Sequence, residues 1–589
     1  MYTAHKHLQI LIALLKKHGV THLVLSPGAR SIPFVRSVEI DPDFTCYSVV
    51  DERSAAFFAM GLAQELNQPV GLACTSSTAT CNYYSAVVEA YFQQVPLVLL
   101  TFDRDQYLLG QMENQMIEQK GMYGIYCQTS ITIPNVKDSH DFGYCQRIIN
   151  EALLEMTHHG GKPVQINIPI FSPDAFNVKQ LPEVKKIERL IAGTQSKEWE
   201  EKKENICSKK KILFVFGQGK CLTQEEEQAL NVFCEQYDCV IATEHMSNVH
   251  NKYTLLTYGL AETISDGKFS EYMPDLLISY GGNVSGRLKD LFRTRPNQVE
   301  HWSIREDGKL VDIFKNLSVI YESTLLYFLH YFSDTDTENS NAHEYYKIWE
   351  HGVSDAKVRN VKFSNFYVAQ KIAENVQPNS IVHTGILNST RHMNFFELDN
   401  SIEYYSNIGA FGIDGTLSTF LGQSVATDKM CYLLLGDLSF LYDMNSVSIR
   451  HLRGNVRIIV VNNGGGGEFH YIMGKERIPT IDKHISAGHH HSVQGWVESL
   501  GFAFYSAHSK EEFDQQFERF MKYDGEVPAV IEVFTDMEED AQITKQVIAE
   551  LRQEEMSEKI KRQSLNAGRK LLHNWQRKEM EKEKRTYDK

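Results

Sequence analysis

The sequence predicts an α/β protein built from three doubly wound domains, each containing a parallel sheet. Short apolar segments such as 70–74 and 96–101 alternate with helical patterns, and each segment ends in a polar turn. Strands that are apolar along their whole length are typical of a parallel sheet that helices cover on both faces. The 589 residues also exceed what one hydrophobic core usually serves, so about three domains are expected.

Residues 1–180 are predicted to form the first domain. Helical patterns occupy 8–17 and 55–65, and the apolar segment 23–26 predicts a short strand that ends at Pro27-Gly28. Strands that alternate with helices in this way favour a parallel sheet.

Residues 181–345 are predicted to form a linker and a central domain. The charged stretch 183–211 separates this part from the first domain, and strand patterns then recur at 211–216 and 275–280. The acidic, asparagine-rich segment 334–343 marks the next border.

Residues 346–540 are predicted to form the third domain. Its apolar strands end in glycine, aspartate or asparagine, and they lie at 380–385, 432–437, 457–463 and 528–534. In open α/β sheets the ligand binds at these carboxyl ends. Residues 541–589 are strongly charged, which predicts a solvated helical extension without chemistry of its own.

Composition narrows the class of protein and its partners. A net charge of −15 argues against nucleic acid as a partner, because such proteins usually carry a basic face. Apolar runs are strand-sized and fall short of the roughly 20 residues of a membrane span. The N-terminus has no signal-peptide pattern, and ten cysteines occur without a C-x-x-C pair. We therefore expect a cytoplasmic protein that binds no membrane.

Two polar motifs follow strands of the third domain, and they read Gly436-Asp437-Leu438-Ser439 and Asn462-Asn463-Gly464-Gly465. Alone, the first is more often a strand end and the second a turn. Together, a carboxylate and an amide oxygen at two strand ends, 26 residues apart, supply hard ligands of the kind Mg²⁺ prefers. Glycines beside them let a backbone approach a diphosphate closely.

Asp51-Glu52-Arg53 stands at the start of a helical pattern in the first domain. Taken alone, a glutamate there is explained by its favourable interaction with the helix dipole. Beside the metal motif it gains a second interpretation, as an acid that contacts an organic cofactor.

These motifs match the signature of thiamine diphosphate enzymes, and the chain resembles one branch of them, the 2-succinyl-5-enolpyruvyl-6-hydroxy-3-cyclohexene-1-carboxylate synthases of menaquinone biosynthesis. The similar blocks are Ser26-Pro-Gly-Ala-Arg-Ser31, Asp51-Glu-Arg-Ser-Ala-Ala-Phe57, Asn82-Tyr-Tyr, Asp103-Arg104, Asn114-Gln115, Gly412-Ile-Asp-Gly415 and Gly436-Asp-Leu-Ser-Phe440. The resemblance implies pyrimidine-binding, central and diphosphate-binding domains. It also implies a homodimer or homotetramer with active sites shared between subunits.

The resemblance also assigns roles to residues. Glu52 would be the catalytic acid that activates the cofactor, and His489 is a second catalytic candidate. Mg²⁺ would bind Asp437, Asn463 and the Gly465 carbonyl. Thiamine diphosphate would contact Glu52, Ile413, Gly436, Asp437, Leu438, Ser439, Asn463 and Gly465. An anionic acceptor would contact Arg30, Arg104, Asn114, Gln115 and Arg287.

The donor side departs from the family pattern. The family reads Asn-Arg-Gly where this chain has Asn407-Ile408-Gly409, so one donor arginine is missing. The second is expected after Asn388-Ser389, where counting without gaps gives Met393, and Arg391 substitutes only if the backbone shifts. Phe411 stands where a small residue is usual and would fill donor space. These changes favour a 2-oxo acid shorter or less charged than 2-oxoglutarate, such as pyruvate.

Three functions remain open on the sequence. The first is a decarboxylating carboligase, which transfers the acyl carbanion of a 2-oxo acid donor to an anionic acceptor. The second is a simple decarboxylase that releases an aldehyde. The third is a catalytically silent regulatory subunit, which the intact set of Glu52, Asp437 and Asn463 disfavours.

Overall fold

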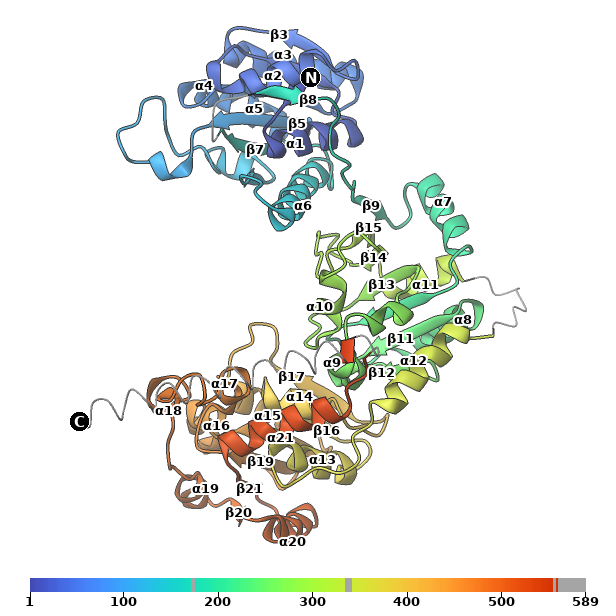
Figure 1. Ribbon diagram of the computed structural model, residues 1–589, viewed down its shortest axis with the longest axis vertical. Coiled ribbons are helices and arrows are strands. Elements are labelled where there is room, and N and C mark those ends of the chain that lie inside the picture. The colour runs from blue at the N-terminus through green and yellow to red at the C-terminus, as the bar shows by residue number, and fades with distance from the viewer. Residues whose placement is uncertain (171–174, 334–341, 555–557, 560–589) are drawn as a thin grey trace, which may run out of the picture. The chain divides into compact units, whose positions relative to one another are not determined.

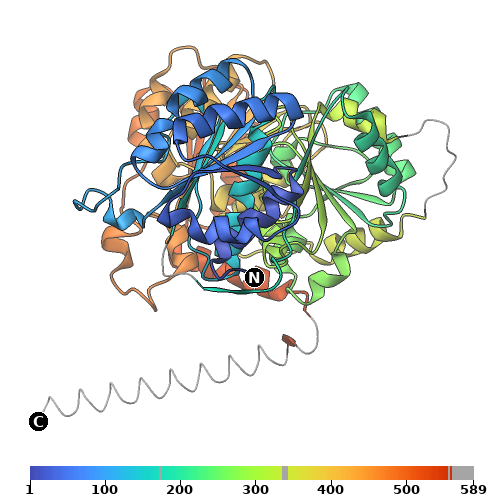
Figure 2. The same ribbon diagram turned by 90° about the horizontal axis from the view of Figure 1, so that it is seen from above.

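The structure is a computed structural model. It describes residues 1–170, 175–333, 342–554 and 558–559. The chain divides into two compact units (Figures 1 and 2). The first unit is Met1–Leu190 together with 318–320, and the second is Ile191–Leu317 together with Tyr321–Lys589. Within them lie three parallel sheets with helices packed against them, which confirms the predicted fold class.

The first unit contains a parallel sheet in the order β3-β2-β4-β5-β7-β6. The strands are β2 (His22–Leu25), β3 (Thr45–Ser48), β4 (Val70–Cys74), β5 (Leu97–Asp103), β6 (Ser130–Thr132) and β7 (Val164–Pro169). The chain reverses direction across the sheet between β2 and β4, and such a switch point opens a crevice at the carboxyl ends. A small antiparallel pair joins β1 (Tyr2–Thr3) to β8 (Phe176–Val178).

Two hydrophobic cores, one on each face, make this sheet doubly wound. One core includes Leu11 and Ile149, and the other includes Ala59 and Ala86. The helices are α1 (Lys6–Lys17), α2 (Ile32–Glu39), α3 (Glu52–Leu66), α4 (Thr78–Asn82), α5 (Tyr84–Phe92) and α6 (Ser139–Glu155), with 3₁₀ turns η1 (Ala29–Ser31), η2 (Gln106–Leu108) and η3 (Gly124–Tyr126). β9 (Glu188–Ile191) ends at the border of the unit.

The second unit begins with a parallel sheet whose strands follow the order β12-β11-β10-β13-β14. They are β10 (Ile212–Phe216), β11 (Cys239–Thr243), β12 (Thr254–Leu256), β13 (Leu276–Tyr280) and β14 (Glu300–Ile304), and β15 (Leu317–Glu322) comes next in the chain. The helices are α7 (Ser196–Ile206), α8 (Gln224–Gln236), α9 (Tyr258–Thr263), α10 (Leu288–Arg293), α11 (Leu325–Phe332) and α12 (Glu344–Asp355), with η4 (His245–Ser247) and η5 (Lys268–Tyr272).

The same unit contains a third parallel sheet in the order β17-β16-β18-β19-β21-β20. Its strands are β16 (Ile381–Thr384), β17 (Glu403–Ser406), β18 (Cys431–Gly436), β19 (Val456–Asn462), β20 (Ala503–Ala507) and β21 (Ala529–Phe534). The helices are α13 (Asn365–Asn375), α14 (Asn388–Met393), α15 (Thr416–Val425), α16 (Asp437–Tyr442), α17 (Gly467–Ile472), α18 (Ile481–His484), α19 (Gln494–Ser499), α20 (Lys510–Met521) and α21 (Met537–Glu550), with η6 (Met444–Ser448).

The predicted start of the C-terminal extension at residue 541 is wrong, because helix α21 runs through it. The expected border after residue 540 falls inside this helix, and Asp540, Ile543, Thr544 and Val547 are buried rather than solvated. Figure 1 shows α21 in red near α13 and α17, and it contacts both of these helices. Residues 560–589 of the predicted extension, and most of the predicted border 334–343, lie outside the described residues. Among the residues that are described, no helix is both long and apolar enough to span a membrane.

Candidate active site

Asp437 and Asn463 stand at the carboxyl ends of two neighbouring strands. β18 ends at Gly436 and β19 at Asn462, and the two strands pair in register with Gly436 opposite Val461. Asp437 is 2% exposed, and its Oδ2 accepts hydrogen bonds from the backbone N–H groups of Gly464 at 2.8 Å and Gly465 at 3.0 Å. The structure therefore brings both halves of the predicted metal motif together.

The two adjacent asparagines have different partners. Asn462 is buried, and its amide donates to Glu532 Oε1 at 2.7 Å and to the His491 carbonyl at 2.8 Å. Asn463 donates its amide N–H to Asp540 Oδ2 at 3.3 Å, so this contact does not use its Oδ1. Asp540 was missed at the sequence level because it is 77 residues away in the chain. It orients the predicted metal ligand.

The glycine turn after Asn463 has a conformation that side chains would not permit. Gly464 and Gly465 have φ angles of +79° and +149°. A Cβ on Gly465 would lie 2.5 Å from the Ser486 carbonyl, and one on Gly467 would lie 2.6 Å from the Asn463 amide nitrogen. Glycine is therefore required for this backbone to turn so closely beside the metal motif.

The buried carboxylate of Asp437 has an environment that suits a divalent cation. The contacts of Asp437 are the backbone N–H groups of Leu438, Gly464 and Gly465, with the His489 ring 3.3 Å away. Burial raises the pKa of Asp437 to about 6 despite these hydrogen bonds, because the buried charge is incompletely compensated. A hard cation such as Mg²⁺, which prefers carboxylate, amide and carbonyl oxygens, would supply the missing compensation.

Ile413 and Ser439 also lie together, as predicted for residues of one site. The Ser439 hydroxyl donates to the Ile413 carbonyl at 2.7 Å, and the Ile413 side chain packs partly against the core of the third sheet. This hydrogen bond ties the loop before α15 to the first turn of α16. It fixes the position of Ile413 relative to Asp437.

His489 is held as a neutral side chain beside Asp437. Its Nδ1 accepts a hydrogen bond from the His491 N–H at 3.1 Å, which places the ring proton on Nε2. Burial lowers the pKa of His489, and the neighbouring His491 and His490 rings lower it further. A proton at Nε2 therefore lies close to the carboxylate of the metal motif.

The predicted donor residues form a mostly apolar group. Ile408 and Met393 are buried in the core of the third sheet, and Ser389 is partly buried in the first turn of α14. Phe411 has a φ of +60° and is exposed.

Arg391 has a partner that the sequence did not suggest. Its Nη1 and Nη2 lie 2.6 Å and 2.9 Å from the two carboxylate oxygens of Glu468. The guanidinium also lies over the Tyr471 ring, with its carbon 4.6 Å from the ring centroid. Burial opposes the charge of Arg391, but the Glu468 carboxylate keeps its pKa above the ordinary value.

In the first unit, Arg30, Arg104 and Gln115 form a basic cluster. Arg30 Nη1 donates to Gln115 Oε1 at 3.4 Å, and Arg104 Nη2 pairs with Glu113 at 3.1 Å. Burial and the charge of Arg104 both lower the pKa of Arg30. Within the described part of the chain, the buried Arg104 Nε has no hydrogen-bond partner. Asn114 is exposed next to this cluster.

Glu52 is the first residue of α3 in the same unit. Asp51 caps the helix by accepting a hydrogen bond from the Ser54 N–H at 2.8 Å, so the position of Glu52 is fixed by a regular helix start. Glu52 is partly buried, and its charge raises the pKa of Cys74, which burial already raises. The structure therefore orders this glutamate at the carboxyl edge of the first sheet.

The guanidinium of Arg287 is engaged by neighbouring groups of its own unit. Its guanidinium donates to the carbonyls of Ala261 at 3.1 Å and Ile264 at 2.5 Å, and to Asp266 at 2.9 Å. These contacts satisfy the last turn of α9. In the second unit the predicted acceptor arginine thus serves as a helix cap.

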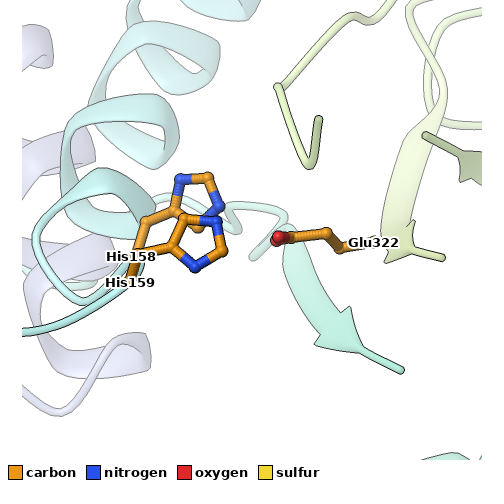
Figure 3. Close-up of side chains that lie close together, drawn as sticks. All are labelled: His158, His159 and Glu322. Atoms are coloured by element: carbon orange, nitrogen blue, oxygen red, sulfur yellow. The ribbon is translucent and has the colours of Figure 1, made fainter. Parts of the chain in front are cut away.

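Figure 3 shows three further side chains, those of His158, His159 and Glu322. The two histidine rings stack in the first unit with centroids 4.1 Å apart. Glu322 belongs to the second unit. We infer no metal site from these three residues.

Comparison with known proteins identifies the class. Residues 5–122 match the family model for the thiamine pyrophosphate enzyme, N-terminal TPP binding domain. Together with the three parallel sheets, this match defines a thiamine diphosphate-dependent enzyme.

Full-length relatives narrow the class to one family. The chain is 34% identical to the 2-succinyl-5-enolpyruvyl-6-hydroxy-3-cyclohexene-1-carboxylate synthase of Bacteroides thetaiotaomicron, over 94% of this chain and 100% of the relative. The synthase of Bacteroides fragilis is 33% identical over the same shares, and that of Desulfotalea psychrophila is 31% identical over 90% and 99%. The chain belongs to the 2-succinyl-5-enolpyruvyl-6-hydroxy-3-cyclohexene-1-carboxylate synthase family.

Proposed function

We propose that the protein is a Mg²⁺-dependent decarboxylating carboligase, which removes CO₂ from a 2-oxo acid and transfers the remaining acyl unit to an anionic acceptor. The observation that carries this proposal is the meeting of Asp437, Asn463 and Gly465 at two neighbouring strand ends. The named activity of full-length relatives supports it.

Asp437, the Asn463 Oδ1 and the Gly465 carbonyl would hold Mg²⁺. Gly436, Leu438 and Ser439 would line the diphosphate, and Ile413 would support the bend between the two rings of the cofactor. Glu52 would hydrogen-bond the aminopyrimidine. When bound, thiamine diphosphate supplies the nucleophilic carbon and accepts the electrons released on decarboxylation.

The acceptor would bind the first unit through Arg30 and Arg104. Two guanidinium groups lie close enough there for one to lower the pKa of the other, and the Arg104 Nε is buried without a partner in the described chain. An anion placed between the two guanidinium groups would relieve their repulsion and accept hydrogen bonds from their N–H groups. Gln115 and Asn114 would orient it.

The donor would be a 2-oxo acid without a distal carboxylate, such as pyruvate. Ile408 and Met393 are buried in the apolar core, and the donors of Arg391 are engaged by Glu468. A dicarboxylic donor would find neither of the two family arginines available. Losing one such charge-assisted contact costs about ten- to a hundred-fold in affinity.

A second candidate, the simple decarboxylase, is favoured by His489 alone. Its ring lies 3.3 Å from Asp437 Oδ2, and a ring that had taken up a second proton from solvent would return to the neutral form by protonating the acyl unit in place of an acceptor. Assaying for aldehyde after incubation with 2-oxo acid alone separates the two functions.

We also propose a homodimer or homotetramer in the cytoplasm, with each active site shared by two subunits. Large apolar side chains are exposed on α3 and α5, including Phe57, Phe58 and Phe92, and Phe92 is 70% exposed. A second copy would cover such a surface.

The test is a donor and acceptor screen with thiamine diphosphate and Mg²⁺, following CO₂ release and product formation. We expect release of CO₂ from pyruvate and a ligated product with an anionic acceptor. Glu52→Gln should abolish turnover while Mg²⁺ binding at Asp437 is kept. Undiminished turnover by Glu52→Gln would remove the proposed mechanism.

A further inference from the structure

Glu468 occupies the two N–H groups of Arg391 through which an arginine binds a carboxylate. A planar guanidinium meets a planar carboxylate through two hydrogen bonds, and the two side chains are only 16% and 12% exposed. Arg391 Nη1 also donates to Asn388 Oδ1 at 2.5 Å. Bidentate pairing of this kind is the geometry in which arginine binds carboxylate ligands.

The pair lies at the edge of the third sheet where the cofactor is expected. Glu468 is in the first turn of α17, three residues after Gly465, the predicted carbonyl ligand of Mg²⁺. Arg391 is in α14, the helix that follows the carboxyl end of β16. Ligands of open α/β sheets bind at this edge. Both residues therefore lie at the edge of the sheet where ligands of such sheets bind.

We propose that Glu468 is a specificity-determining residue that excludes 2-oxo acids with a second carboxylate from the donor site. This inference rests on the proposed decarboxylation of a 2-oxo acid. Glu468 neutralises Arg391 and occupies the two N–H groups with which the arginine would bind a second carboxylate. A donor carboxylate could reach Arg391 only by displacing Glu468, which would leave a buried charge unpaired.

A second carboxylate near Arg391 is engaged elsewhere. Glu262 interacts electrostatically with Arg391, but its carboxylate accepts a hydrogen bond from the Arg287 N–H at 3.0 Å. Lys545 lies over the same Tyr471 ring, with 5.8 Å between its Nζ and the centroid, and donates to the His470 carbonyl. Removing the charge of Glu468 would thus leave Arg391 able to bind a substrate carboxylate.

The first test measures donor preference in Glu468→Gln with thiamine diphosphate and Mg²⁺. We expect the ratio of kcat/KM for 2-oxoglutarate to that for pyruvate to rise about ten- to a hundred-fold, the value of one charge-assisted contact. The double variant Glu468→Gln with Arg391→Gln should return the ratio to the wild-type value, because the gain depends on Arg391.

A matched control breaks another ion pair of the same sheet. Glu403 begins β17 and pairs with Lys429, which precedes β18, so this pair lies at the amino edge of the sheet. Glu403→Gln should leave the donor ratio unchanged. Should Glu468→Gln fail to fold, Glu468→Met provides an apolar replacement with the same expected direction.

The second readout is binding without turnover. Glutarate should raise the melting temperature of Glu468→Gln, with and without the cofactors, and butyrate should not. Neither compound should stabilise the wild-type protein or the double variant. A dicarboxylate that stabilises wild type and Glu468→Gln equally would contradict the proposal.

The two proposals fail in different ways. An unchanged donor ratio in Glu468→Gln, or the same rise in the double variant or in Glu403→Gln, overturns the role of Glu468. If the wild-type protein decarboxylates none of the 2-oxo acids tested, the proposed function is wrong. The glutarate measurement then still decides whether Glu468 blocks carboxylate binding at Arg391.

Discussion

The first and third sheets share one strand order, but different polar side chains follow the strands at their carboxyl edges. The orders β3-β2-β4-β5-β7-β6 and β17-β16-β18-β19-β21-β20 are the same when the strands of each sheet are counted along the chain. The first edge carries Arg30 and Arg104, whereas the third carries Asp437, Asn463 and the glycine turn. Topology thus places a ligand crevice in each sheet, and the residues after the strands decide whether it attracts an anion or a cation.

The largest effect should follow from removing the negative charge of the third edge. Asp437→Asn should lower Mg²⁺ affinity by more than about 100-fold, because even partners outside the metal shell are worth ten- to a hundred-fold. Calorimetric titration with Mg²⁺ in the presence of thiamine diphosphate measures this. Asp428→Asn, exposed and paired with Arg453 at the amino edge of the same sheet, should bind like wild type. Equal affinities for the two variants would contradict the assigned metal site.

The basic edge of the first sheet should control the acceptor and leave the metal untouched. Arg104→Gln should raise the KM for an anionic acceptor by about ten- to a hundred-fold, since its guanidinium is otherwise only partly used. Release of CO₂ in the absence of acceptor should stay unchanged. Arg287→Gln is the matched control, because its guanidinium caps α9. Steady-state kinetics in which Arg287→Gln affects the acceptor KM more strongly would reverse this assignment.

A smaller effect is expected from Asp540, which orients Asn463 from outside the metal shell. Asp540→Asn keeps the shape of the side chain but weakens its hold on the Asn463 amide, so Mg²⁺ affinity should fall about ten-fold. Melting curves taken alongside the titrations show whether the loss comes from unfolding. A loss as great as that of Asp437→Asn would mean that Asp540 is itself a ligand.

The sequence predicted the fold class and the meeting of Asp437 with Asn463, because both follow from strand ends in a parallel sheet. It did not predict the partners of these residues. Glu468 and Asp540 each reach a predicted site residue across 77 positions, and no local pattern encodes such a contact. Arg287 was expected at the acceptor, yet the unsatisfied carbonyls at the end of α9 engage it. Matching blocks identify residue types, whereas the packing of neighbouring elements decides which donors stay available.

The smallest effect concerns the free energy of unfolding, which one buried histidine in each unit should make dependent on pH. Burial lowers the pKa of His18, which follows α1, and of His383 in β16 to about 4. Because the unfolded chain binds these protons below about pH 6.5, each histidine should lower the free energy of unfolding as the pH falls from 6.5 towards 4. Between about pH 7.5 and about pH 5 the loss should be about 2 kcal/mol per histidine. His383→Gln and His18→Gln should each reduce this acid dependence in denaturant titrations at the two pH values, whatever their stability at neutral pH. A reduction in only one variant would show that only that histidine is buried without its proton in the folded protein.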